Sequence, residues 1–402
     1  MPTRPRRSGA GNTPSVRYSR MVRVGTPETA ANSSIAHSFD CPWTLPVFTV
    51  TVITVNTTSP GGGVNQQPTC SLPELLIGEL RELPGHADLT FSAPPERLSG
   101  GFWAEMFVLH LADPTKRLPS VVVARFAPDP ALARWESTVQ SGVAEQGFPT
   151  PAVHCSGGPG GGVGRAWCVM DLASGQPLLA GLSGLKALVR LPRLSRQLPE
   201  QLASITARLH GLDAHPVRSD LESISGQRVG ADLLVDHLTE RAHELGDTRL
   251  IAATDYLVST QPEPTVEVIC HGDLHPFNVL TDRGRLTLLD WTAAQIADPT
   301  YDLAFTALLL SMAPLDAPTA FQPTIGRAAR WVSRRFLQQY EHQTQHHVDQ
   351  RQLDWHTTLH ATRILTELEG WTASQTADLH RGHPWNAIAP SIRDLLDTTA
   401  SR

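Results

Sequence analysis

The chain has 402 residues and a formal net charge of −6 at pH 7, and 41% of its residues are hydrophobic. This length allows a sizeable core in about two or three structural units, and the acidic balance argues against nucleic acid as a partner, because phosphate-binding surfaces are basic. The five cysteines are widely spaced without a C-x-x-C motif, which argues against a disulfide framework or zinc finger and favours a reducing, cytoplasmic location. No run of roughly 18 apolar residues occurs, so no membrane partner is expected.

Residues 1–70 are rich in Ser, Thr, Pro, Gly and Arg and have little hydrophobic periodicity. Such a composition buries too little apolar surface to offset the entropy of ordering the chain. We therefore expect a disordered or loosely ordered N-terminal extension, with the folded part beginning near Ser71.

The next part of the chain, residues 71–171, has the pattern of strands with one inserted helix. Apolar and β-branched residues predict strands within Leu98–Leu111 and over Ser120–Phe126. A helix is predicted after the second strand, because apolar residues then recur at spacings of three and four. These residues are Leu132, Trp135, Val139 and Val143.

The glycine-rich run from Gly157 to Gly164 lies between two further predicted strands. It lacks the G-K-[ST] ending of a Walker phosphate loop and opens no evident helix. We interpret it as a hairpin loop.

After Asp171 the pattern becomes mainly helical. A helix is predicted to begin near Pro199 and to end at Gly211, with a buried face formed by every third or fourth residue. A strand over Val266–Cys270 and a short hairpin then follow, and helices are expected from Tyr301 onward. The hairpin strands are Val279–Leu280 and Leu286–Leu289, joined by the turn Asp282-Arg283-Gly284.

The segment around this hairpin contains an ordered set of polar residues. His271-Gly272-Asp273 follows the strand, Asn278 comes five residues after Asp273, and Asp290 ends the hairpin. A carboxylate beside an acceptor hydroxyl can orient it and take its proton during phosphoryl transfer. Magnesium binds oxygen ligands, which an amide and a second carboxylate supply. The order of these residues therefore indicates a phosphoryl-transfer site.

This segment closely resembles the aminoglycoside phosphotransferase family, whose members share the protein-kinase-like fold and include choline, homoserine and macrolide kinases. The family has an H-G-D-x-x-x-x-N motif followed by a strand that ends in Asp, often Asp-Trp. Here these positions are His271-Gly272-Asp273, Asn278 and Asp290-Trp291, and a later D-P-x-x-D-L-A pattern is matched from Asp298 to Ala304.

The resemblance implies a role for each matched residue. Asp273 would be the catalytic base, and Asn278 and Asp290 would hold magnesium. His271, His275 and Asp302 would brace the catalytic loop.

A weaker resemblance extends upstream to about residue 95. Residues 98–102 lie where such enzymes place the turn over the nucleotide phosphates, and Arg125 stands where kinases place a phosphate-contacting lysine. Glu136 would be its ion-pair partner, and residues 169–172 would form the adenine-contacting hinge. The residues that would bind the nucleotide are Ser99, Gly100, Gly101, Arg125, Glu136, Met170 and Asp171.

The resemblance also implies an α+β, bilobal protein-kinase-like fold. A small antiparallel sheet with one helix would form a nucleotide-binding N-lobe over residues 71–171. Residues 172–402 would form a larger, mainly helical C-lobe with the catalytic loop and acceptor-binding helices. The implied cofactors are ATP or GTP with Mg²⁺, and the implied partner is a small molecule that carries a hydroxyl group.

Two other functions stay open at this stage. A kinase-like module could bind nucleotide with little transfer, since Arg125 replaces the usual lysine, and Arg and Lys differ in geometry and hydration. A metal phosphohydrolase could use His271 with Asp273, although the spaced Asn278 would then be unexplained. His356 and His360 form an i, i+4 pair that we interpret as a solvated or partly buried helix face rather than a zinc site. Glu367, Glu369 and Trp371 are candidates for lining the acceptor pocket.

Overall fold

The computed structural model describes residues 54–55, 71–99, 104–113, 115–179, 185–264, 266–312, 322–377 and 380–400. The chain divides into two units, Met1–Asp40 and Cys41–Arg402, and every described residue belongs to the second. Most of the expected N-terminal extension, together with Gly100 and Gly101, therefore lies outside the described residues.

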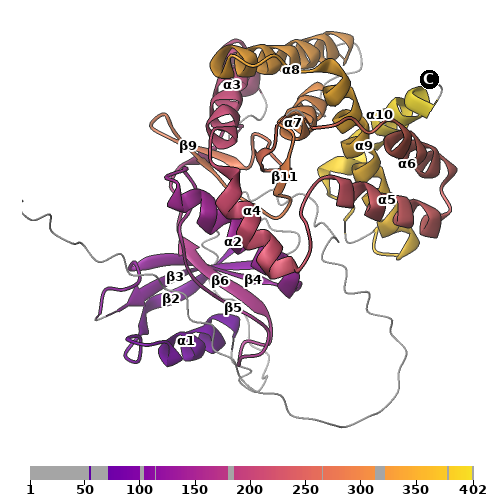
Figure 1. Cartoon of the computed structure of the whole chain (residues 1–402). Coiled ribbons are helices and arrows are strands. Elements are labelled where there is room, and N and C mark those ends of the chain that lie inside the picture. Colours follow the sequence, from indigo (N-terminus) through magenta and orange to yellow (C-terminus); the bar gives the residue numbers. More distant parts are fainter. Residues whose placement is uncertain are drawn as a thin grey trace, which may run out of the picture. The chain divides into compact units, whose positions relative to one another are not determined.

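An antiparallel six-stranded sheet forms the first part of the described chain (Figure 1). Its strands lie in the order β1-β2-β3-β4-β6-β5, with β4 at the centre between β3 and β6. The strands are β1 (Thr54–Val55), β2 (Thr90–Ser99), β3 (Glu105–Ala112), β4 (Val121–Ala127), β5 (Val153–Gly157) and β6 (Ala166–Asp171). The loop between β5 and β6 contains the glycine-rich run, which confirms its interpretation as a hairpin loop.

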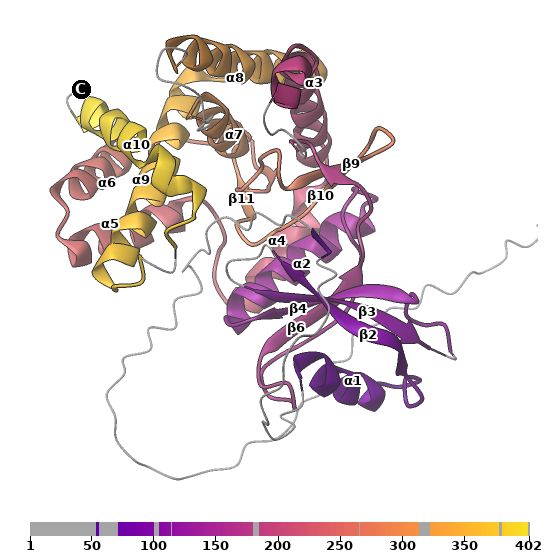
Figure 2. The same ribbon diagram turned by 180° about the vertical axis from the view of Figure 1, so that it is seen from behind.

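Helices α1 (Leu72–Glu82) and α2 (Pro130–Glu145) lie on opposite sides of this sheet (Figures 1 and 2). The four apolar residues that predicted α2 are all buried, and the carboxylate of Asp129 caps the first turn. The sequence interpretation missed α1, although Ser71 and Glu74 form a capping box at its start. Strand β1 precedes this helix and pairs with β2, so the start of the folded part near Ser71 stays a prediction.

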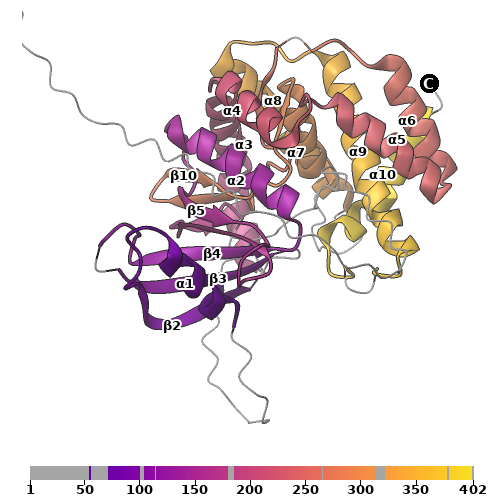
Figure 3. The same cartoon turned by 60° about the horizontal axis from the view of Figure 1, so that its bottom comes forward.

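The rest of the chain is mainly helical, and Figure 3 shows α5, α6, α9 and α10 side by side. Its helices are α3 (Leu185–His210), α4 (Ala214–Ser225), α5 (Asp232–Leu245), α6 (Thr248–Thr260), α7 (Thr300–Met312), α8 (Gln322–Thr344), α9 (Gln350–Ala373) and α10 (Pro384–Ala400). The predicted start at Pro199 is wrong, because α3 already begins at Leu185. Packing of Leu202, Ile205 and Leu209 into the core outweighs the helix-breaking tendency of this proline.

Two small sheets place the polar segment among the helices. Strand β8 (Val268–Cys270) pairs with β11 (Gln295–Ala297), and the predicted hairpin is formed by β9 (Val279–Asp282) and β10 (Arg285–Leu288). Strand β7 (Gln176–Pro177) pairs with the other side of β9. The motif residues therefore lie in the loops that follow β8 and β10.

One continuous hydrophobic cluster joins α2 to the helical part of the chain. Trp135 and Val139 of α2 belong to the same buried cluster as Leu202 of α3, Ile296 of β11 and Phe336 of α8. This shared core fixes α2, which carries Glu136, relative to the loops that carry the motif. The boundary at residue 171 between two lobes remains a proposal.

No helix among the described residues is long and apolar enough to cross a membrane.

Candidate active site

The loop after β8 makes a turn that only glycine fits. Gly272 has φ +73°, in the left-handed region, and a Cβ atom on it would lie 2.0 Å from the carbonyl oxygen of Ala293. Any side chain at this position would clash with the backbone that follows Trp291. His271 and Asp273 therefore flank Gly272, which no other residue can replace unless the loop shifts.

Asp302 at the start of α7 holds the backbone of this turn. Its carboxylate accepts hydrogen bonds from the backbone N–H groups of His271 at 2.8 Å and Gly272 at 2.6 Å, and from Nε2 of His210 at 3.1 Å. Burial acts to raise the pKa of Asp302, but these hydrogen bonds and the neighbouring histidines outweigh it, and the pKa is lowered from its ordinary value. The geometry fits the bracing role implied for Asp302.

His271 and His275 lie within the same loop and support its backbone. Nε2 of His271 lies 2.9 Å from the carbonyl oxygen of Leu289, and its Nδ1 lies 3.3 Å from the backbone nitrogen of Asp273. Burial lowers the pKa of His271, so the neutral ring can donate at one nitrogen and accept at the other. The Nδ1 atom of His275 accepts from the backbone N–H of Phe277 at 3.2 Å.

Asp273 and Asn278 contact each other directly. The side-chain amide of Asn278 donates to Oδ2 of Asp273 at 3.1 Å and to the Asp273 carbonyl at 3.0 Å. Both residues are at most 3% exposed, yet Oδ1 of each has no hydrogen-bond partner among the described residues. Buried oxygens are normally hydrogen-bonded, so their unpaired state is typical of a site that binds something else.

Asp290 contributes a third oxygen of this kind. It follows β10 in the left-handed conformation, with φ +66°, and the backbone N–H of Leu289 donates to the Asn278 carbonyl at 2.9 Å. Its Oδ1 accepts from the hydroxyl of Thr292 at 2.8 Å, while its buried Oδ2 has no partner among the described residues. One amide oxygen and one carboxylate suit a hard cation such as Mg²⁺, and the residues present fit that ion.

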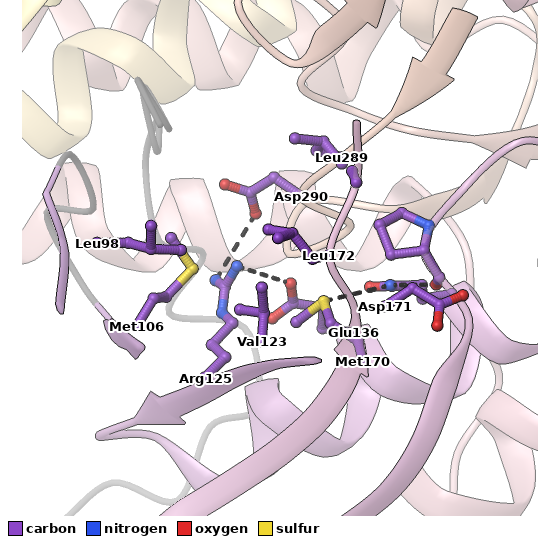
Figure 4. A pocket seen from close by; sticks show the side chains of 13 residues that line it. Leu98, Met106, Val123, Arg125, Glu136, Met170, Asp171, Leu172, Leu289 and Asp290 are labelled. Carbon is purple, nitrogen blue, oxygen red and sulfur yellow. Dashed lines mark hydrogen bonds and ion pairs between the residues drawn. The ribbon is translucent and has the colours of Figure 1, made fainter. Parts of the chain in front are cut away.

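Arg125 of β4 reaches this carboxylate from the sheet. Figure 4 shows its guanidinium between Glu136 and Asp290, with Nη1 at 3.0 Å from Glu136 and Nη2 at 3.7 Å from Asp290. Burial raises the pKa of Glu136 to about 7, against the opposing effect of Arg125. The sequence-predicted partners Arg125 and Glu136 thus lie together, and they meet the predicted metal ligand Asp290.

This ion-pair group lines part of a pocket whose space of about 500 Å³ includes open solvent. Its walls are mostly apolar with a few charged groups, which is the usual character of a small-molecule site. It is lined by Leu98, Met106, Val123, Arg125, Glu136, Gln140, Pro151, Met170, Asp171, Leu172, Ala173, Leu289 and Asp290 (Figure 4).

The predicted hinge residues border the pocket in different ways. Met170 faces it and lies 3.6 Å from the side-chain amide of Gln140. The carboxylate of Asp171 instead binds His154 at 2.7 Å and the backbone N–H of Ala152 at 3.3 Å, so it is directed toward β5. Ser99 ends β2, but Gly100 and Gly101, predicted to cover the phosphates, lie outside the described residues.

The candidate acceptor residues near the C-terminus are engaged in other contacts. Trp371 is 6% exposed and stacks on His380 with ring centroids 4.3 Å apart, and Glu369 pairs with Arg393 at 2.7 Å. His356 and His360 are 4% and 0% exposed, so they lie in the core rather than on a solvated helix face.

Sequence reasoning missed several residues that support the loop from a distance. His210 binds Asp302 and the Tyr340 hydroxyl, Thr306 donates to the Leu274 carbonyl at 2.7 Å, and Arg363 donates to the Gly272 carbonyl at 3.1 Å. These contacts join residues 32 to 130 positions apart, so no local sequence pattern predicts them.

His210, Cys270 and Asp302 place three possible ligand atoms within 4.8 Å of one another. Asp302 already accepts from backbone and His210, and the Cys270 thiol lies 3.5 Å from the Asp298 carbonyl. Burial raises the pKa of Cys270 well above its ordinary value, which disfavours the thiolate that a metal needs. We therefore interpret these three residues as a structural, hydrogen-bonded cluster rather than a metal site.

Comparison with known proteins places these features in a family. The sequence pattern of the phosphotransferase enzyme family (APH) matches residues 96–340. The chain is 37% identical over 106 residues to the uncharacterized protein YcbJ of Bacillus subtilis (strain 168), which is 25% of this chain and 34% of that protein. It is 32% identical over 177 residues to an aminoglycoside 3'-phosphotransferase of Streptomyces fradiae, which is 43% of this chain and 57% of that enzyme. The matches thus span between about a third and somewhat more than half of these relatives.

Solved structures show the same fold at low sequence identity. A protein from Ralstonia eutropha JMP134, whose name relates it to aminoglycoside phosphotransferases, has a TM-score of 0.56 at 18% identity over 82% of this chain and 98% of its own. A thermostable mutant of APH(4)-Ia, in a ternary complex with ADP and hygromycin B, has a TM-score of 0.50 at 15% identity over 81% of this chain and 96% of its own. These similarities confirm the predicted α+β, bilobal protein-kinase-like fold. With more than half of its residues matched by the family pattern, this chain belongs to the phosphotransferase enzyme family.

Proposed function

We propose that the chain transfers the γ-phosphate of Mg-ATP to a hydroxyl group of a small molecule. One observation carries this proposal: three buried side chains, Asp273, Asn278 and Asp290, each keep an oxygen without a partner among the described residues. They follow one another in adjoining loops, next to a pocket that holds an Arg–Glu ion pair. GTP remains an alternative nucleotide, and a cytoplasmic location is part of the proposal.

Asp273 would bind the acceptor hydroxyl and take its proton as the oxygen attacks phosphorus. Asn278 holds one oxygen of this carboxylate, so the other is free to face the hydroxyl. A base held in this way contributes through orientation as well as through proton transfer.

Arg125 would contact the nucleotide phosphates from the sheet side. Glu136 holds the guanidinium at 3.0 Å, and the apolar walls formed by Val123 and Met170 would enclose the nucleotide base. Binding energy in the pocket thus positions the phosphate chain relative to the loop that carries Asp273.

Asn278 and Asp290 are the residues that would hold magnesium. The ion neutralises charge on the phosphate groups when it is bound. The two side chains keep their oxygens directed into the site through Asp273 and Thr292, respectively.

Aminoglycosides are the first acceptors to test, because a matched relative is an aminoglycoside 3'-phosphotransferase and a solved neighbour binds hygromycin B. Amino alcohols, choline-like molecules and sugars form the rest of the panel. The assay measures ADP release from Mg-ATP with each acceptor, beside the Asp273→Ala variant. The proposal fails if no acceptor raises turnover or if the variant is as active as the parent chain.

A nucleotide-binding module with little transfer is the second candidate, and the approach of Arg125 to Asp290 favours it. The guanidinium lies beside the proposed metal ligand and has to make room for the phosphates. Thermal unfolding tests nucleotide binding, and turnover then separates the two functions: at ligand near 100 times Kd, Mg-ATP would stabilise either protein by about 2.7 kcal/mol. A shift of this size without turnover on any acceptor would support the module.

A further inference from the structure

The peptide groups on both sides of Gly272 are held by charged side chains from two different helices. The N–H of Gly272 donates to Asp302 of α7 at 2.6 Å, and the carbonyl of Gly272 accepts from Nη2 of Arg363 of α9 at 3.1 Å. That carbonyl belongs to the peptide bond that leads into Asp273. The arrangement therefore restrains the backbone immediately before the proposed base.

Arg363 is buried at a position where packing alone does not require a charge. It is 4% exposed, and its guanidinium carbon lies 4.9 Å from the ring centroid of Phe305 on α7. Removing a charged group from water costs several kcal/mol, and an apolar side chain of similar size could fill the space between the helices without that cost. The cation–π contact and the Gly272 carbonyl offset part of this cost.

Ionisable groups surround Arg363, while its Nε and Nη1 atoms have no hydrogen-bond partner among the described residues. Burial raises the pKa of the neighbouring Tyr301 hydroxyl to about 12, opposed by the positive charge of Arg363. Burial likewise raises the pKa of Glu367, one helical turn further along α9, to about 7, opposed by Arg363 and Arg241. The side chain thus lies in a polar group that continues from the catalytic loop into α9.

The conformational freedom of Gly272 gives this restraint its purpose. A left-handed residue between two rotatable peptide groups can relax in either direction once its hydrogen bonds are lost. Rotation of the peptide plane between Gly272 and Asp273, through ψ of Gly272 and φ of Asp273, would turn the Asp273 side chain away from the phosphate. Asp302 fixes the peptide before Gly272. The second peptide is held at its N–H group by Nδ1 of His271, at 3.3 Å from the Asp273 nitrogen, and at its carbonyl by Arg363.

We propose that Arg363 is a positioning residue for phosphoryl transfer: by binding the Gly272 carbonyl, it fixes the peptide that orients the Asp273 carboxylate. This inference rests on the proposed function, since it assigns Arg363 a role through the base. Arg363 itself touches no reacting atom in this scheme.

The test uses Arg363→Met and Arg363→Lys in the full chain, with Arg351→Met as a matched control. Arg351 is an exposed arginine in the first turn of the same helix. Two quantities are measured below the unfolding temperature of each variant: kcat with an acceptor found in the ADP-release assay, and amide hydrogen exchange of the peptide spanning residues 268–280. Kd for Mg-ATP is measured in parallel.

Arg363→Met is expected to lower kcat by about 10- to 100-fold, the effect of misplacing a catalytic group by about 1 Å. Exchange at Gly272 and Asp273 should speed up at least tenfold, while Kd for Mg-ATP stays within twofold, since the nucleotide pocket is formed by other residues. Arg363→Lys keeps a cationic donor and should recover most of kcat and of the exchange protection. Arg351→Met should match the parent chain.

Unchanged exchange at Gly272 and Asp273 in Arg363→Met would overturn the inference, and so would equal losses in the Met and Lys variants. A Kd that rises together with the loss of kcat would also overturn it, because this indicates general damage to the fold. Amide hydrogen exchange can be measured even if the chain phosphorylates no acceptor. If the parent chain transfers phosphate to no acceptor while exchange still responds to Arg363, the proposed function fails and the positioning contact stands.

Discussion

The side-chain amide of Asn278 donates to Oδ2 of Asp273 at 3.1 Å, so the proposed metal ligand and the proposed base orient each other. An asparagine that donates through Nδ2 leaves its Oδ1 to accept from another group, and that oxygen has no partner among the described residues. One hydrogen bond therefore sets which oxygen of Asp273 is left for the acceptor and which atom of Asn278 is left for a cation.

Replacing Asp273 by Asn should separate transfer from nucleotide binding. The amide keeps the size of the side chain but cannot accept the acceptor proton, so kcat should fall by about 10²- to 10⁴-fold. Kd for Mg-ATP, measured by calorimetry, should stay within about threefold of the parent value. The control is Asp255→Asn, which changes an exposed aspartate of α6 and should leave kcat unaltered. Retention of full activity by Asp273→Asn would remove this residue from the reaction.

Replacing Asp290 by Asn should change the magnesium requirement. The variant loses one negative charge at the proposed ion site, and the Mg²⁺ concentration for half-maximal activity should rise at least tenfold. The same substitution removes one of the two anionic partners of Arg125, so the effect must be measured over a full Mg²⁺ titration at saturating nucleotide. An unaltered titration midpoint would show that Asp290 does not hold the ion.

Gly272→Ala should damage the catalytic loop far more than the same change in the neighbouring hairpin. Its Cβ atom would meet the Ala293 carbonyl oxygen at 2.0 Å, whereas a Cβ atom on Gly284 has no other atom within 4 Å. Both glycines have positive φ, +73° and +86°, so the backbone strain is similar and amounts to roughly 1–2 kcal/mol. The unfolding temperature and kcat should drop sharply for Gly272→Ala and only slightly for Gly284→Ala; equal losses would mean that the contact with Ala293 is unimportant.

The parts of the fold that sequence alone predicted are those with a local signal. The apolar period of α2, the turn residues of the β9–β10 hairpin and the spacing of Asp273, Asn278 and Asp290 are all read within short windows. The start of α3 was misplaced because a proline within a helix looks like a first residue, and helix packing overrode that preference. For α1 a signal exists in the Ser71 and Glu74 capping box, but the sequence analysis predicts a start near Ser71 only from the change in composition.

The support of the site could not be predicted because it depends on residues distant in sequence. Arg363 and Gly272 are 91 positions apart, and His210 and Asp302 are 92 apart. His356 and His360 show the same limit: their spacing places them on one helix face, but the packing of Tyr301 and Trp355 against them decides that this face is buried.

Glu367 is expected to lower the free energy of unfolding as the pH rises, and a variant without this carboxyl group can test it. Burial raises its pKa from the ordinary value of 4.5 to about 7, against Arg363 and Arg241. Between these two values the folded chain binds a proton that the unfolded chain has released, so the free energy of unfolding falls as pH rises. The loss is at most about 1.4 kcal/mol per pH unit, and less here because the side chain is only partly buried.

Glu367→Gln removes this ionisation and should therefore gain stability relative to the parent chain as the pH rises from 5 to 7.5. The relative gain in Tm should be about 2–4 °C, measured by calorimetry at several pH values. Glu369→Gln is the control, since this residue lies on the same helix but pairs with Arg393 near the surface. A difference in Tm between Glu367→Gln and the parent chain that is the same at pH 5 and pH 7.5 would mean that Glu367 is ionised in the folded chain throughout this range. The charge beside Arg363 would then be permanent rather than set by pH.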